Sequence, residues 1–234
     1  MKKVASRHGL TCLLHEKPFA GVNGSGKHNN WSLSTNRGEN LLDPGKCPAE
    51  NMRFLLFITA VIVAVDEHQD LLRLSVASAS NDHRLGAHEA PPAIVSIYLG
   101  DELINILQSI EDGSEYEDLD PDYMDIGVES LPNFAKDTTD RNRTSPFAFT
   151  GNKFEFRMPG SSVSISAPNF MLNTAICDVL SSFADELEQA EDFDKALRKL
   201  IKRSFREHKR ILFNGNNYSE EWVKEAERRG LLNL

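Results

Sequence analysis

The chain lacks several features that mark specialised classes of protein. Its 234 residues include only three cysteines, Cys12, Cys47 and Cys177, and no C-x-x-C pair. An odd, unpaired set argues against a disulfide framework or a cysteine-based zinc site and favours a reducing cytoplasm. Basic residues are also in deficit, with 26 Lys and Arg against 35 Asp and Glu and a net charge of −9. No basic face is easily assembled from such a chain, so nucleic acid is not an expected partner.

The sequence also gives no reason to expect a secretory leader or a membrane-length segment. The start, MKKVASRHGL, carries two lysines without an apolar run behind them, so it does not look like a signal peptide. The most apolar stretch is FLLFITAVIVAV, the twelve residues 54–65, whereas a membrane-spanning helix needs about 20. We therefore expect a cytoplasmic protein with no membrane partner and a buried helix over residues 49–73.

Periodicity and punctuation predict the order of the elements. A helix ends at Gly9, and strands over 11–19 and 28–35 flank a glycine-rich loop. After the apolar helix we expect irregular chain that ends in a strand before residue 100, and then an alternating strand over 147–160. From residue 169 onward the chain reads as helices, the first with one face formed by Phe170, Thr174, Cys177, Leu180 and Leu187. Strands first and helices last predict an α+β fold.

An acidic run interrupts the middle of the chain. Residues 101–140 hold thirteen Asp and Glu against one lysine, Lys136. Helical periodicity is restricted to DELINILQSI, residues 101–110. Charge blocks of this kind are usually solvated, so we expect a surface excursion.

The loop GVNGSGKHNNWS, residues 21–32, satisfies all but the last position of the nucleotide motif G-x-x-x-x-G-K-[ST]. His28 stands where Ser or Thr is required. A phosphate loop should also open a helix, whose N-terminal amides hold the phosphate, but Asn29, Asn30 and Trp31 are poor helix formers. The sequence thus argues against this motif and leaves His28 to be explained.

Two strands carry chemistry on one face each. In NKFEFR, Lys153, Glu155 and Arg157 alternate with two phenylalanines. In the same way, HNNWS places His28 and Asn30 on one face, together with Ser32. Imidazole and carboxylate together suit Mn²⁺ or Mg²⁺. An amphipathic edge strand and a structural histidine explain the same patterns, and the sequence leaves open whether the two strands are neighbours.

Arginines near two loops are candidates for anion binding. In DRNRTS, Arg141 and Arg143 share one face of an extended segment, and paired guanidiniums suit phosphate or carboxylate. A surface pair beside Asp140 is the ordinary alternative. NDHRLGAHEAPP adds Arg84 and Glu89 in a segment that we expect to be irregular, where function is often carried.

Taken in order, these segments resemble the glutamine synthetase family. KPFAGVNGSGKHNNWS, residues 17–32, is similar to the ATP-region signature of that family, and RLGAHEAP, RNRTS and KFEFR resemble its later active-site segments. The resemblance covers about residues 11–173, and the sequence of the loop is most similar to that of the large type III branch of the family. It implies part of a catalytic domain built as a largely antiparallel curved sheet, or half-barrel, surrounded by helices.

The resemblance implies a role for each matching residue. The implied ligands of Mg²⁺ or Mn²⁺ are His28 and Glu155, the implied ATP contacts are Ser32, Asn30, Arg143 and Lys153, and the implied glutamate contacts are Asn23, Gly24, Arg84 and Arg157. The implied catalytic residues are Glu89, which takes a proton from ammonium, and Arg143, which stabilises the phosphoryl group. Asn30 departs from a histidine that the family often carries. The arginine that often follows RNR is absent from SPFAFTG.

The implied reaction is ATP-dependent synthesis of glutamine from glutamate and ammonia through γ-glutamyl phosphate, in a large homo-oligomer. Two alternatives stay open: a ligase of the same fold that joins glutamate to another amine, and a non-catalytic assembly or binding module. We assign residues 1–168 to part of the catalytic domain, with an acidic insertion at about 101–136, and residues 169–234 to its helical C-terminal region. The family's N-terminal β domain and paired metal-binding glutamates have no counterpart in this sequence, so we expect an internal piece that is inactive alone.

Overall fold

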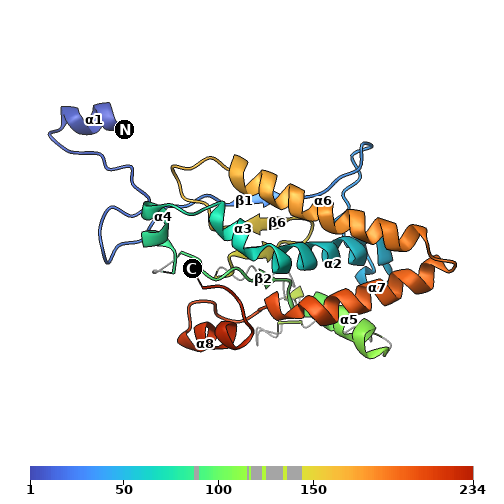
Figure 1. Ribbon diagram of the computed structural model, residues 1–234. Coiled ribbons are helices and arrows are strands. Elements are labelled where there is room, and N and C mark those ends of the chain that lie inside the picture. The colour runs from blue at the N-terminus through green and yellow to red at the C-terminus, as the bar shows by residue number, and fades with distance from the viewer. Residues whose placement is uncertain (87–89, 115, 117–122, 125–133, 136–143, 234) are drawn as a thin grey trace.

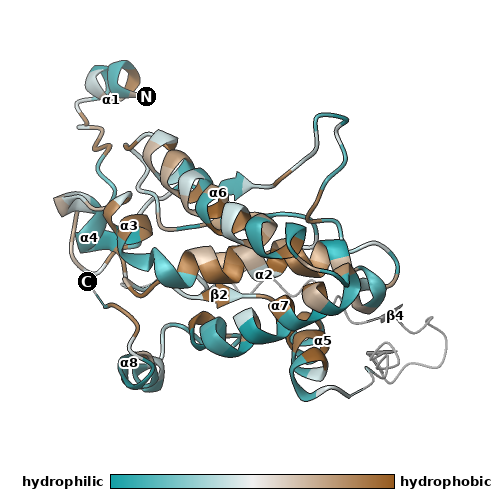
Figure 2. Ribbon diagram, turned by 45° about the vertical axis from the view of Figure 1, so that its right-hand side comes forward, coloured by the Kyte–Doolittle hydropathy of each residue, from teal (hydrophilic) through white to brown (hydrophobic). Residues whose placement is uncertain are grey.

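An apolar helix organises the fold. The computed structural model describes residues 1–86, 90–114, 116, 123–124, 134–135 and 144–233. In it, helix α2 (Met52–Glu67) is buried along most of its length. Asn51 caps this helix by accepting a hydrogen bond from the Phe54 amide. It packs against α6 (Ser166–Glu188) and α7 (Phe193–His208). Figures 1 and 2 show α2 between these two helices, and its apolar colour contrasts with the polar outer side of α7. The expected buried helix is therefore the centre of the core.

The remaining elements are short. The other helices are α1 (Lys2–Arg7), α3 (Gln69–Leu74), α4 (Ala79–Arg84), α5 (Asp101–Asp112) and α8 (Glu220–Arg228), with 3₁₀ turns η1 (Pro48–Glu50) and η2 (Lys209–Ile211). The strands are β1 (Asn29–Trp31), β2 (Ile97–Tyr98), β3 (Tyr123–Met124), β4 (Phe134–Ala135), β5 (Phe147–Phe149) and β6 (Phe154–Phe156). Among the described residues, no helix is both long and apolar enough to cross a membrane.

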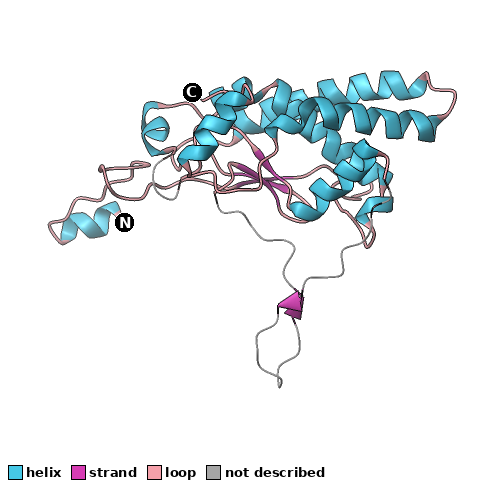
Figure 3. Cartoon of the chain, turned by 90° about the horizontal axis from the view of Figure 1, so that it is seen from below, coloured by secondary structure: helices cyan, strands magenta, loops and turns pink. Residues whose placement is uncertain are grey.

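Four strands form an open sheet in the order β1-β6-β5-β2, in which only β2 and β5 run parallel. The α+β class is thus confirmed. One face of the sheet meets the helices: the Phe149 ring packs in a tilted arrangement against the rings of Phe154 and of Phe54 on α2, at centroid distances of 5.3 and 5.9 Å. The indole of Trp31 donates a hydrogen bond to Asn173 of α6 at 2.8 Å. Most of the helices lie on one side of the sheet in Figure 3, and Asn30 and Glu155, which alternate with helix-facing residues, project to the other side.

Several predicted elements differ from the structure. The helix over 49–73 breaks at His68, whose φ of −117° and ψ of 28° are not helical, into α2 and α3. The strand over 147–160 is a hairpin, because Gly151 with φ of 89° turns the chain between β5 and β6. Residues 11–19 form no strand. The carbonyl of Glu16 instead accepts the Ser25 amide at 2.6 Å and closes the glycine loop on itself.

Three further expectations are wrong for reasons of packing. Residues 79–84, expected to be irregular, form α4, which Ser78 caps at the Asn81 amide. The first part of the acidic run is a helix, α5, as its periodicity predicted, but it is not a solvated excursion, because it buries Leu103, Ile106 and Leu107 against the core. The buried face of α6 is Leu172, Ala175, Ile176, Val179, Phe183 and Leu187, whereas Phe170 is exposed. Helices therefore occur throughout the chain, and the predicted order of strands first and helices last does not hold.

Candidate functional site

The pairing of β1 with β6 creates a polar surface on the side of the sheet away from α2. Asn30 stands directly opposite Glu155 in the antiparallel register. Residues paired in this way project to the same face, so the polar faces of both strands coincide. The Nδ1 of His28 lies 3.7 Å from Oε2 of Glu155, and the His28 side chain is 61% exposed. The structure thus makes the two strands neighbours, which the sequence had left open.

Glu155 and Arg157 form a buried ion pair on β6 and just beyond its end. Nε and Nη2 of Arg157 donate to Oε2 of Glu155 at 3.2 and 3.0 Å, and Nη1 donates to the Ser145 carbonyl at 3.3 Å. Both residues are largely buried, with 7% of Glu155 and 4% of Arg157 exposed. A buried charge is tolerated when it is paired and hydrogen-bonded in this way. The pair fixes Glu155 where His28 can reach it. Because β6 lies between β1 and β5, it is an interior strand, not the edge strand of the ordinary explanation.

Ser32 and Lys153 lie at the other end of this pair of strands. The hydroxyl of Ser32 donates hydrogen bonds to Oδ1 of Asn40 at 2.8 Å and to the Asn152 carbonyl at 3.2 Å. The amide of Asn40 holds the same carbonyl at 2.8 Å. These bonds anchor the turn that precedes Lys153, which is half-buried. Both residues therefore border the surface formed by His28, Asn30 and Glu155.

Arg84 ends α4 and is buried, with 3% exposed. Its Nε donates to Oδ1 of Asn81 at 2.9 Å and its Nη2 to the carbonyls of Met158 and Pro159 at 2.8 and 3.3 Å. Desolvation by this burial lowers the pKa of Arg84, and the charge of Glu16 acts in the opposite direction. In this structure the guanidinium holds the chain just beyond β6.

The glycines of the loop are explained by this arginine. A Cβ on Gly24 would lie 2.3 Å from Cγ of Arg84, and one on Gly26 would lie 2.5 Å from its Nη1. No side chain fits at either position without movement of Arg84. The resemblance implies that Gly24 lies at glutamate, and the contact seen in the structure is with Arg84. Asn23 is exposed beside them.

Glu16 is a charged residue of this region that the sequence did not single out. Its carboxylate is 2% exposed and accepts hydrogen bonds from the amide and the hydroxyl of Ser162, the first at 2.9 Å. These bonds, chiefly that of the Ser162 hydroxyl, lower the pKa of Glu16 to about 2 although burial acts to raise it. A Cβ on Gly160 would touch the same carboxylate at 3.0 Å. The sequence around Glu16, just before Lys17-Pro18, has no hydrophobic periodicity that would predict its burial.

This cluster is continuous with the paired strands. Gly26 and Gly160 form an antiparallel bridge, and the Lys27 amide donates to the Pro159 carbonyl at 2.9 Å. The bridge continues the antiparallel pairing toward Glu16 and Arg84 with the register shifted by one residue, since Asn29 pairs with Phe156 but Gly26 pairs with Gly160. The loop therefore leads into a strand, which confirms that it is not a nucleotide loop of the helix-opening kind.

Two predicted catalytic residues, Glu89 and Arg143, lie outside the described residues, as does Arg141. Among the described residues, no group of three or more His, Cys, Asp or Glu could hold a metal ion. His28 and Glu155 alone offer one imidazole and one carboxylate, a donor set that suits Mn²⁺ or Mg²⁺. Their separation allows both to contact one ion, but an ion that prefers six donors needs others as well.

Comparison with known proteins agrees with the resemblance seen in the sequence. Residues 1–94 match the model of the glutamine synthetase catalytic domain, and residues 196–234 match that of the glutamine synthetase C-terminal domain. The chain belongs to the glutamine synthetase family.

Its relatives agree along the whole chain. It is 54% identical to the type-3 glutamine synthetase of Dictyostelium discoideum and 53% identical to a glutamine synthetase of Butyrivibrio fibrisolvens, in each case over 100% of this chain. A glutamine synthetase of Bacteroides fragilis (strain YCH46) is 48% identical, again over 100% of the chain. The chain spans about a third of the length of these relatives, 32 to 33%. The resemblance seen in the motifs, including its type III character, is confirmed.

Proposed function

We propose that this chain supplies part of the active site of a glutamate–ammonia ligase, which forms glutamine from glutamate, ammonia and ATP through γ-glutamyl phosphate. The observation that carries the proposal is the β1–β6 register, which places His28 beside Glu155. The family supports ATP and a divalent metal ion, Mg²⁺ or Mn²⁺, as the groups bound there. When bound, the ion would neutralise charge on the nucleotide phosphates.

The chain's own residues have distinct roles in this proposal. His28 and Glu155 hold the metal ion, and Arg157 orients Glu155. Ser32, Asn30 and Lys153 line the adjoining surface, where ATP would bind. Asn23, Gly24, Arg84 and Arg157 lie at the glutamate end, with Arg84 and Gly24 in direct contact.

Two residues outside the described part complete the proposed chemistry. Arg143 would stabilise the phosphoryl group during transfer from ATP to the γ-carboxylate of glutamate. Glu89 would remove a proton from ammonium, because ammonium itself has no lone pair with which to attack the acyl phosphate. Ammonia then displaces phosphate and leaves the amide.

We further propose that the protein is cytoplasmic and that it self-associates into a large homo-oligomer. Residues 1–168 would form part of the catalytic domain, with an acidic insertion at about 101–136, and residues 169–234 its helical C-terminal region. Among the described residues only His28 and Glu155 are proposed as metal ligands, and we expect these two donors to bind a metal ion without supporting turnover in the isolated chain. We expect it to make no glutamine on its own.

Mn²⁺ binding tests the proposal directly, because free Mn²⁺ has a strong electron paramagnetic resonance signal that binding removes. We expect the 234-residue chain to lower the free Mn²⁺ signal of a mixture of Mn²⁺ and ATP below the level that ATP alone gives. His28→Ala should weaken this binding by roughly tenfold or more, as losses of ligands and of their supporting residues at metal sites do. His8→Ala, at an exposed histidine beside α1, is the matched control. Equal binding by wild type and His28→Ala would contradict the proposal.

A further inference from the structure

A second charged region lies between α5, α7, η2 and α8, which carry none of the residues proposed for metal, ATP or glutamate. It contains a cavity of about 540 Å³, within the roughly 300–1,000 Å³ typical of small-molecule sites. The described residues that line it are Ile104, Gln108, Phe205, Arg206, Glu207, Lys209, Arg210, Leu212, Arg228 and Arg229. Half of these ten side chains are cationic and one is acidic, in a protein whose net charge is −9.

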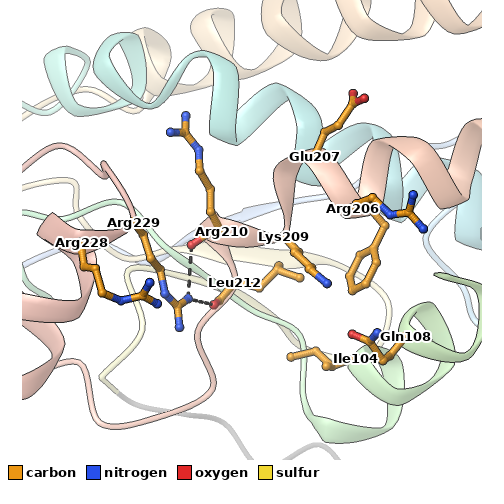
Figure 4. A pocket seen from close by; sticks show the side chains of 10 residues that line it. Ile104, Gln108, Arg206, Glu207, Lys209, Arg210, Leu212, Arg228 and Arg229 are labelled. Atoms are coloured by element: carbon orange, nitrogen blue, oxygen red, sulfur yellow. Dashed lines mark hydrogen bonds between the residues drawn. The ribbon is translucent and has the colours of Figure 1, made fainter. Parts of the chain in front are cut away.

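The directions of the side chains increase this imbalance. Figure 4 shows Arg210 and Glu207 extending away from Ile104 and Gln108. Arg210 is turned to α2, where its Nε donates to Asp66 at 2.8 Å. One cation and the acidic lining residue are thus directed elsewhere. Two clusters remain: Arg206 with Lys209 at one end of the cavity, and Arg228 with Arg229 at the other.

Each remaining cluster holds two cations around one carboxylate. The carboxylate of Glu111 accepts a hydrogen bond from Nζ of Lys209 at 2.7 Å and one from Nε of Arg206 at 3.3 Å. These two cations, Lys209 first, lower the pKa of Glu111. A pair of cations on one carboxylate keeps one positive charge, so this end of the cavity has an excess of positive charge.

The second cluster repeats the arrangement. The carboxylate of Glu225 accepts hydrogen bonds from Nε and Nη2 of Arg228, both at 2.7 Å, and from Nε of Arg229 at 2.6 Å. Arg229 also donates to the Leu212 carbonyl at 2.8 Å, which fixes it at the cavity wall (Figure 4). The Arg228 side chain is 73% exposed and can turn toward a ligand.

Ile104, Phe205 and Leu212 add apolar side chains to the lining of the cavity, and Gln108 adds a side-chain amide. Two separated positive clusters with apolar side chains in the same lining suit a small molecule that carries more than one anionic group. Guanidinium forks bind phosphate oxygens in a bidentate manner, and a compact phosphate concentrates more charge than a carboxylate. We propose that this cavity binds a phosphate-bearing small molecule through the Arg206–Lys209 and Arg228–Arg229 clusters.

Titration calorimetry with sodium tripolyphosphate tests this on the 234-residue chain. Ionic strength is held constant with NaCl, and EDTA removes metal-dependent binding. We expect saturable binding of one tripolyphosphate. Arg228→Gln and Lys209→Gln should each weaken it by roughly tenfold, the effect of losing one charge-assisted hydrogen bond. Arg228 is exposed and Lys209 is partly exposed, so we expect both variants to keep the core intact, which circular dichroism verifies.

Arg203→Gln is the matched control. Arg203 lies on α7 in an ion pair with Glu186 at 2.7 Å and does not line the cavity, so its loss should leave the affinity unchanged. Absence of saturable heat would overturn the proposal, as would equal weakening by Arg203→Gln, which indicates only general attraction of a polyanion. Tighter binding of citrate than of tripolyphosphate would overturn the assignment to phosphate. The metal-free conditions make these outcomes independent of the proposed ligase activity.

Discussion

The two charged regions of this molecule hold their charges in opposite ways. On β6, the side chains of Glu155 and Arg157 are 9% and 4% exposed and each fixes the other inside the protein. Around the cavity, Arg206 and Arg228 are 59% and 73% exposed, and their ion pairs face solvent. Desolvated charges must be paired, whereas exposed pairs contribute little to stability. The first region is therefore a rigid site built into the sheet, and the second is an adjustable surface on helices.

Removing the buried carboxylate should give the largest effect. Glu155→Ala removes the carboxylate that pairs with the buried Arg157 guanidinium, and breaking such a pair costs about 3–5 kcal/mol. Urea unfolding followed by circular dichroism measures the loss in free energy of unfolding. A loss below about 1 kcal/mol would mean that Arg157 reaches solvent or another acceptor easily, and the contrast between the regions would fail.

The next effect tests the glycine contact with Arg84. In Gly24→Ala the new methyl group collides with Cγ of Arg84, and overpacking of this kind costs about 1–3 kcal/mol. In an Arg84→Ala background the same change should cost much less, because the obstructing side chain is gone. Equal costs in both backgrounds would show that the alanine is opposed by something other than Arg84.

A smaller effect concerns acid stability. The pKa of Glu16 is lowered to about 2 in the folded protein, so its ionised form stabilises the fold above pH 4.5 and this contribution is lost as the pH falls toward 2. Glu16→Gln should therefore reduce stability at neutral pH and flatten its decline between pH 4.5 and 2. Urea unfolding at a series of pH values measures both. Glu39→Gln, at an exposed pair with Arg53, should retain the wild-type decline.

The smallest effect is expected at that exposed pair itself. Arg53 and Glu39 lie 2.8 Å apart with side chains 54% and 53% exposed. Such pairs contribute about 0–1 kcal/mol, so Arg53→Ala should change the unfolding free energy by less than about 1 kcal/mol, measured as for Glu155→Ala. A change as large as that at Glu155 would remove burial as the explanation for the difference between the regions.

Local patterns predicted a large part of this structure. The end of α1 two residues before Gly9 follows from residues a few positions apart, and so do the cap of α8 at Ser219 and the end of α8 two residues before Gly230. Predictions that depended on packing were less accurate. The face assigned to α6 by periodicity included exposed Phe170, because two apolar stripes were available and contact with α2 selected the other.

By itself, the sequence determined which side chains share a face. An extended backbone alternates its side chains at every residue, so His28 falls with Asn30, and Glu155 with Arg157, whatever the partner strands. The tertiary structure alone decided that β1 and β6 are neighbours in a register that brings His28 to Glu155. It also decided that Glu16 and Arg84 are buried together beside Gly24 and Gly26. Strand pairing and burial depend on residues far apart in the chain, and no local pattern encodes which distant segments meet.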